Sequence, residues 1–156
     1  MYPARTSVLL GEDRWFRLIQ NVIECLKLDL SGAVVLTEMG KRPLSVDPLI
    51  AAAAGAEKVI AVAKDSRYGS AENVLASGMA LARRWKLHGR IEPISSITAA
   101  HVAQADVVTN LGFVRPIDAQ FVSAMKGGAV VAHMCEAWEI RPEDVDVAAC
   151  RARMCR

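Results

Sequence analysis

The sequence predicts a doubly wound α/β domain with a mainly parallel, five-stranded sheet and helices on both faces. Short apolar runs alternate with amphipathic helical patterns along the whole chain. The runs are apolar at successive positions, which is typical of strands that are buried on both faces of a parallel sheet. This alternation gives right-handed βαβ crossovers. The 156 residues, 53% of them hydrophobic, suffice for one domain with an ordinary core.

The first element is an amphipathic helix over 12–28. Its apolar residues recur at helical spacing, with charged residues between them: Trp15, Ile19, Val22, Ile23 and Leu26. This apolar face either covers the sheet within one chain or pairs with a second copy of the chain in a homodimer. We expect residues 1–156 to form a single domain, with 1–30 as a helical extension and 31–156 as the α/β core.

Two strands and two helices follow. We expect strands over 33–36 and 58–63, and helices over 46–54 and 70–87. Gly55 is predicted to stand just after the first of these helices, where glycine adopts a left-handed conformation at little cost.

The second half continues the alternation. A strand over 90–95 is predicted to lie at a sheet edge because Pro93 lacks an N–H donor. The remaining elements are a helix over 98–105, a strand over 106–109, a helix over 117–125, a strand over 129–132 and a helix over 142–153. The whole pattern predicts a Rossmann-like, three-layer fold.

Composition excludes several classes of function. The net charge of +2 is spread along the chain, so we expect no nucleic-acid partner. No apolar run is long enough to cross a bilayer and no signal-like segment starts the chain, so we expect a cytoplasmic protein without membrane contact. Four cysteines are predicted to be reduced thiols: Cys25, Cys135, Cys150 and Cys155.

Polar residues gather in the loops that follow the predicted strands. These loops span 37–42, 64–69, 109–115 and 133–141. The turns at the opposite edge do not gather charged, glycine and aromatic residues in this way. Ligands of open parallel sheets bind beyond the carboxyl ends of the strands, so we expect the ligand site among these loops.

Cofactor-binding candidates come from the first three of these loops. They are Glu38, Gly40, Asp65, Ser66, Asn110 and Gly112. The first loop has one glycine where a dinucleotide fingerprint has three. Asp65 follows Gly40 at about the spacing of a ribose-binding acid, but it and Ser66 are equally suited to capping a helix.

Catalytic candidates lie in the last loop. His133, Glu136 and Glu139 are predicted to act as general acids or bases near neutral pH. Three further side chains are predicted to bind substrate: Arg115, Trp138 and Arg141. We expect no metal site, because the spacing of His133 and Cys135 differs from that of structural zinc sites.

The residues from Ala105 to Arg153, which begin with ADVVTN, resemble the end of the substrate-binding domain of D-2-hydroxyacid dehydrogenases. In that family the catalytic arginine, glutamate and histidine lie in a following nucleotide-binding domain, so none of them is assigned here. The resemblance implies a domain related to NAD(P)-dependent dehydrogenases.

The residues from Val34 to Ser66 are similar to the first motif of S-adenosylmethionine-dependent methyltransferases. Glu38 and Gly40 match the acid and one glycine of that motif. Lys41, Arg42 and Pro43 replace the rest of its glycine-rich turn, and Ala63 stands where an acid ends the second strand, two places before Asp65.

We therefore expect a dehydrogenase-related domain that binds a small anionic metabolite or a nucleotide cofactor. A companion nucleotide-binding domain is one source of NAD(P) chemistry. The alternatives are a methyltransferase-like enzyme that uses S-adenosylmethionine, and a non-catalytic binding or assembly subunit.

Overall fold

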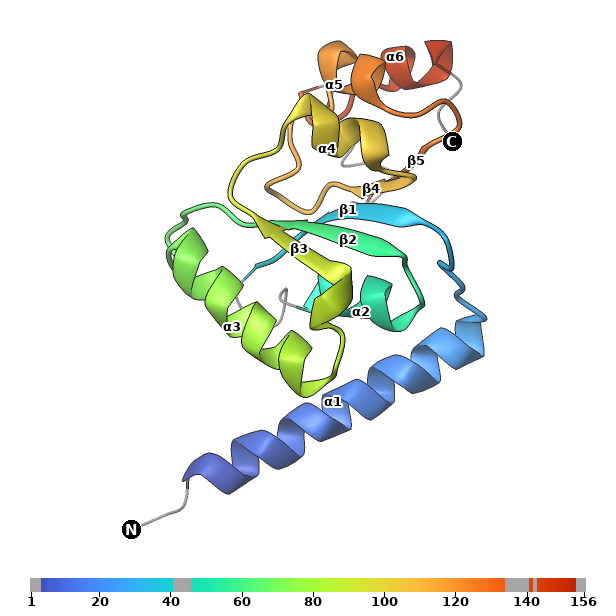
Figure 1. Cartoon of the computed structure of the whole chain (residues 1–156). Helices are drawn as coiled ribbons and strands as arrows, with labels where there is room; N and C mark the ends of the chain where they lie inside the picture. The colour runs from blue at the N-terminus through green and yellow to red at the C-terminus, as the bar shows by residue number, and fades with distance from the viewer. Residues whose placement is uncertain (1–3, 41–45, 134–140, 142, 154–156) are drawn as a thin grey trace.

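The computed structural model of the chain describes residues 4–40, 46–133, 141 and 143–153. It contains a five-stranded sheet in the order β3-β2-β1-β4-β5 (Figure 1), and every neighbouring pair of strands is parallel. The strands are β1 (Val34–Glu38), β2 (Lys58–Val62), β3 (Ile91–Ile94), β4 (Val107–Thr109) and β5 (Val130–Ala132). The five predicted strands and their parallel arrangement are confirmed.

Helices cover both faces of the sheet, as the sequence predicts. Figure 1 shows α2 (Asp47–Ala53) and α3 (Ala71–Arg84) on one face, with α1 (Ala4–Leu26) outside them. The other face carries α4 (Ala99–Gln104), α5 (Ala119–Ala124) and α6 (Val147–Ala152). The core consists of two apolar clusters, because alternate strand residues point to opposite faces: Val35 and Val59 join one cluster, and Leu36 and Ile60 join the other.

Two local predictions are also confirmed. Gly55 follows the end of α2 with φ = +94°, a conformation that side chains with a Cβ rarely adopt. β3, which contains Pro93, pairs only with β2 at the edge of the sheet.

Several predicted helix boundaries were wrong. The first helix begins at Ala4 rather than at residue 12. It ends at Leu26, where Lys27 takes φ = 51°. The helix predicted over 70–87 covers Ala71–Arg84 and is followed by Lys86 at φ = 59°.

Capping residues account for the other two corrections. Asp118 accepts a hydrogen bond from the Phe121 amide, so α5 begins at Ala119 instead of 117. Asp146 accepts one from the Ala149 amide, so α6 begins at Val147 instead of 142. The preceding Val145 forms a parallel bridge with Ile117.

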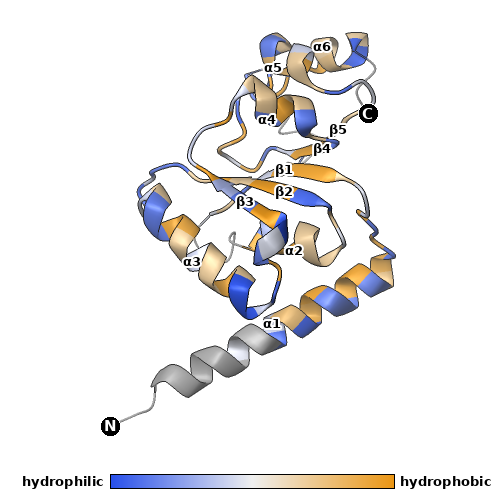
Figure 2. Cartoon of the chain, viewed as in Figure 1, coloured by the Kyte–Doolittle hydropathy of each residue, from blue (hydrophilic) through white to orange (hydrophobic). Residues whose placement is uncertain are grey.

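The N-terminal helix uses its apolar residues in two ways. Phe16 stacks on Trp85 at the end of α3, with ring centroids 4.8 Å apart, and Ile19 is 7% exposed. Figure 2 shows further apolar residues along α1. Of these, Trp15, Leu18, Val22 and Leu26 are exposed, so α1 covers the α2–α3 layer with only part of its apolar surface.

Two further findings concern membrane-spanning helices and cysteine pairing. Within the described residues, no helix combines the length and apolar character needed to span a membrane. Neither Cys25 nor Cys150 forms a disulfide, whereas Cys135 and Cys155 lie outside the described residues.

Candidate functional site

Glu38 ties together the two central strand exits of the sheet. It ends β1, is 5% exposed, and its Oε1 accepts hydrogen bonds from the backbone N–H groups of Gly112 at 2.5 Å and Val114 at 2.9 Å. β1 and β4 are neighbours whose following connections lead to opposite faces, so a crevice forms between them. The Glu38 side chain bridges this crevice and holds the loop that follows β4.

A second carboxyl group lies near Glu38 at the start of α2. Burial, and then the charge of Glu38, raise the pKa of Asp47 from its usual 3.8 to about 6. Its Oδ2 is buried and has no hydrogen-bond partner among the described residues. Asp47 is therefore a group that exchanges a proton close to neutral pH.

Asp47 was not predicted from the sequence. The only local signal was an acid followed by Pro48 at the beginning of a helix, which is an ordinary way to start one. Asp47 lies near Glu38 because the chain after β1 turns back to begin α2 beside the end of that strand.

Hydroxyl and amide groups surround the same pair of strand exits. The Thr37 and Thr109 hydroxyls are hydrogen-bonded at 2.7 Å, and Asn110, immediately after β4, is fully buried. The structure thus brings together three of the predicted cofactor-binding residues, Glu38, Asn110 and Gly112, at the β1–β4 exit. Gly40 follows β1 and is half-buried.

Asp65 and Ser66 lie elsewhere, after β2. Asp65 Oδ1 accepts a hydrogen bond from the Ala71 amide at 2.8 Å, and Ser66 Oγ accepts one from the Tyr68 amide at 3.2 Å. The N-cap of α3 is Ser70. Both predicted residues shape the entry to α3, and their role in cofactor binding stays a prediction.

Arg115 is held in place by two contacts. Its Nη1 pairs with Asp144 Oδ1 at 3.2 Å, and its Nη2 donates to the Leu111 carbonyl at 3.2 Å. These contacts restrict the guanidinium before any ligand arrives, which lowers the entropy cost of binding an anion. Its remaining N–H donors retain the planar geometry that suits carboxylate and phosphate groups.

A cleft of about 630 Å³ lies beside Arg115. Its walls come from the exits of β2, β3 and β4 and from α4 and α5. Two cations, Lys64 and Arg115, and one acid, Asp118, which caps α5, line it. The other lining residues are hydroxyl, amide and apolar side chains, among them Ser95, Ser96, Thr98, Ser123, Ile97 and Phe121. The volume falls within the range of small-molecule sites.

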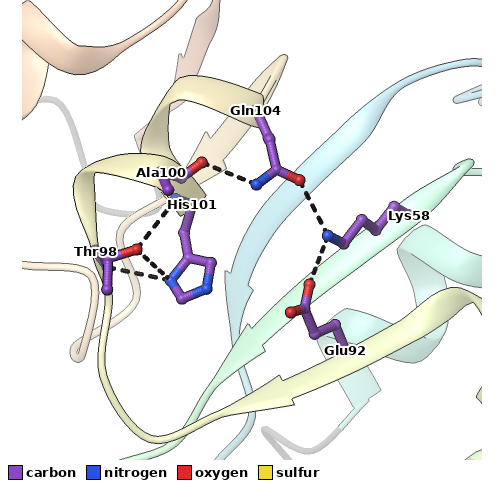
Figure 3. A network of polar contacts seen from close by, with 6 residues as sticks. All are labelled: Lys58, Glu92, Thr98, Ala100, His101 and Gln104. Atoms are coloured by element: carbon purple, nitrogen blue, oxygen red, sulfur yellow. Dashed lines mark hydrogen bonds and ion pairs between the residues drawn. The ribbon is translucent and has the colours of Figure 1, made fainter.

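The wall formed by α4 is fixed at both ends (Figure 3). At the cleft, Thr98 and His101 form a reciprocal capping box. At the opposite edge of the sheet, Lys58 donates to Gln104 at 3.0 Å and pairs with Glu92 at 2.6 Å. The cap thus fixes where α4 begins, directly after the serines and Thr98, and the Lys58 contact joins its other end to the sheet.

The predicted catalytic loop lies mostly beyond what the structure describes. His133 follows β5 and is half-buried, and Arg141 is exposed. Glu136, Trp138 and Glu139 lie outside the described residues. Among the residues that are described, no group of three His, Cys, Asp or Glu side chains is placed to hold a metal ion.

A parallel sheet in the order β3-β2-β1-β4-β5, covered on both faces, defines a Rossmann-like domain. No protein-family model matches the sequence, and no curated protein sequence does. Solved structures share the fold at low sequence identity. The shikimate 5-dehydrogenase of Listeria monocytogenes, in complex with shikimate and NAD, has a TM-score of 0.60 at 9% identity, over 87% of this chain and 48% of that one.

Two more solved structures show how widely the fold is used. A dipicolinate synthase chain from Bacillus halodurans has a TM-score of 0.55 at 18% identity, over 94% of this chain and 47% of that one. Aspartate transcarbamoylase from Trypanosoma cruzi, in complex with N-(phosphonacetyl)-L-aspartic acid, has a TM-score of 0.53 at 19% identity, over 86% and 45%. The chain spans about half the length of these proteins.

The described residues at the β1–β4 crevice do not fit the phosphates of a dinucleotide. A pyrophosphate at this position needs free N–H donors and a positive potential. Glu38 already accepts the Gly112 and Val114 N–H groups, and Asp47 adds a second carboxyl group at the start of α2. The fold is shared with a dehydrogenase solved in complex with NAD, and the mismatch concerns the described residues on either side of 41–45.

Proposed function

We infer that this chain is a dehydrogenase-related, Rossmann-like domain that binds a small anionic metabolite in the cleft between α4 and α5. The observation that carries this proposal is the cleft itself, which combines Lys64, a restrained Arg115 and several hydroxyl groups at the carboxyl ends of the strands. Cations attract a carboxylate or phosphate, and hydroxyl groups orient it. The apolar side chains of Ile97 and Phe121 suit a short carbon skeleton.

We assign NAD(P) binding to a companion nucleotide-binding domain. This assignment is supported by the two carboxyl groups in the β1–β4 crevice, which disfavour a dinucleotide there. The same argument disfavours the alternative of methyl transfer. A bound S-adenosylmethionine needs a free acid beyond β2 for its ribose, but Ala63 is the first residue after that strand and Asp65 accepts the Ala71 N–H.

Calorimetric titration tests the proposal with single compounds from each class. The panel contains short 2-oxo and 2-hydroxy acids, dicarboxylates, sugar phosphates, NAD(H), NADP(H) and S-adenosylmethionine. We expect a small anion to bind and to raise the melting temperature with its concentration, because a ligand of the folded state stabilises it. Binding of a dinucleotide or of S-adenosylmethionine alone would contradict the assignment.

Lys64→Ala locates the binding site. Lys64 is exposed and lines the cleft, so its removal is expected to weaken binding of the anion about fivefold to tenfold without changing stability. Arg83→Ala is the matched control, since Arg83 is an exposed cation of α3 that does not line the cleft. Equal affinities of the two variants for the anion would show that the anion does not bind in the cleft.

A further inference from the structure

α1 carries an apolar row, here called the outer stripe, made of four exposed residues, Trp15, Leu18, Val22 and Leu26, and the half-buried Gly11. These residues are three or four positions apart, so they lie along one side of the helix. Trp15 is 53% exposed, Leu18 48%, Val22 54% and Leu26 69%. The adjoining side of α1 is occupied by Phe16, Ile19 and Ile23, which pack on the fold. Figure 2 shows the apolar residues recurring along the helix.

We propose that the outer stripe binds a second copy of this chain, with the two α1 helices antiparallel about a two-fold axis near Leu18. The resulting dimer is symmetric, because the same surface is used on both copies. Figure 1 shows α1 as the outermost element of its face, where a partner reaches it without displacing another part of the fold.

The exposed area matches what a small stable dimer requires. A large apolar side chain buries about 150–200 Å² in full, so each of the four large residues has on the order of 100 Å² to bury. Two copies therefore contribute about 800 Å² from these side chains alone. With the polar residues beside the stripe, the total approaches roughly 1,000 Å², the lower limit for a biological interface.

The order of side-chain sizes favours an antiparallel pair. In that arrangement Gly11 faces Leu26 of the second copy and Trp15 faces its Val22, so large residues meet smaller ones. A parallel pair would set Trp15 against Trp15 and leave a void at Gly11. Gly11 supports this choice, because a Cβ built there meets no atom within 4 Å and glycine lowers helix stability relative to alanine. In the antiparallel pair, the absence of a side chain at Gly11 leaves room for Leu26 of the second copy.

Light scattering across protein concentrations tests the dimer. From about 1 to about 100 µM, the range in which a dimer of micromolar affinity forms, the mass should rise from one chain to two. Val22→Glu should weaken association at least about tenfold, since it places a charge in the apolar contact. Gln20→Glu adds the same charge to an exposed position on another side of α1 and should leave association unchanged.

Crosslinking tests the antiparallel geometry independently of these variants. In the proposed dimer the two Cys25 residues are about 20 Å apart along the helices, far beyond the roughly 7 Å that a disulfide permits. Mild oxidation should therefore not join two chains through Cys25. Leu18→Cys, made together with Cys25→Ser, should crosslink because it lies at the axis. A chain that stays monomeric at all concentrations, equal association of the two glutamate variants, or crosslinking through Cys25 would overturn the proposal.

Discussion

Among single residues, Glu38 connects the ends of β1 and β4. One carboxylate oxygen accepts two backbone N–H groups from a loop that is 74 and 76 positions away in the sequence. Charge-assisted hydrogen bonds of this kind are roughly twice as strong as neutral ones. The carboxylate thus fixes the loop that leads to Arg115, and it also acts on its acidic neighbour.

That neighbour, Asp47, should make stability depend on pH. The pKa of Asp47 in the folded state, about 6, exceeds its usual 3.8, so folding favours the protonated form. Its contribution to stability is present below about pH 4 and is lost as the pH rises through 6. Asp47→Asn removes this loss. Relative to the wild type, we expect the variant to gain at most about 1 kcal/mol between pH 5 and pH 8, because part of the loss occurs below pH 5 and partial exposure reduces the rest.

Urea unfolding of the wild type and Asp47→Asn at both pH values measures this gain. The comparison between pH values cancels any constant effect of replacing a carboxyl group by an amide. Parallel stability curves for the two proteins would show that Asp47 titrates normally in the folded state.

Among the elements, α3 packs against the sheet through a close contact between Gly78 and Met39. A Cβ at Gly78 would lie 2.9 Å from Met39 Cε and 3.0 Å from its Cγ, and Met39 is fully buried. Gly78→Ala should therefore destabilise the protein by about 1–3 kcal/mol through overpacking, even though alanine is the better helix former.

Chemical denaturation compares Gly78→Ala with two reference proteins. Gly127→Ala is the control, because a Cβ at Gly127 meets nothing within 4 Å, and it should change stability by less than about 0.5 kcal/mol. Shortening the obstructing side chain in Gly78→Ala/Met39→Ala should cost less than the sum of the two single changes. Additive losses would mean that the helix moves away from Met39 instead.

At the scale of the whole molecule, α1 and the α/β core are proposed to unfold as one unit. Phe16 stacks on Trp85 and Ile19 is buried in the cluster beneath α1, so loss of the helix would expose part of the core. We expect a single transition in which tryptophan fluorescence and far-UV circular dichroism coincide. An early, separate loss of helical signal would show instead that residues 1–30 form an independent extension.

The sequence by itself determined the order and type of the elements, because burial on one or both faces imposes a period on the apolar residues. Lys58–Val62 is apolar at nearly every position, which is typical of a strand in a parallel sheet that is covered on both faces. It also determined that the polar loops meet at one edge, since parallel strands end together. Helix ends at Asp118 and Asp146 were missed because a capping hydrogen bond leaves the apolar period unchanged.

Only the tertiary structure decided which polar groups meet at that edge. Glu38 was predicted to bind a cofactor, which stays a prediction, and the structure shows that its carboxylate accepts two backbone N–H groups. Asp47 lies near Glu38 although no sequence motif marks it. Lys64, Ser95 and Arg115 line one cleft although they leave three different strands. Hydrogen bonds and pKa values depend on distances in space, and a short range of sequence carries no measure of those distances.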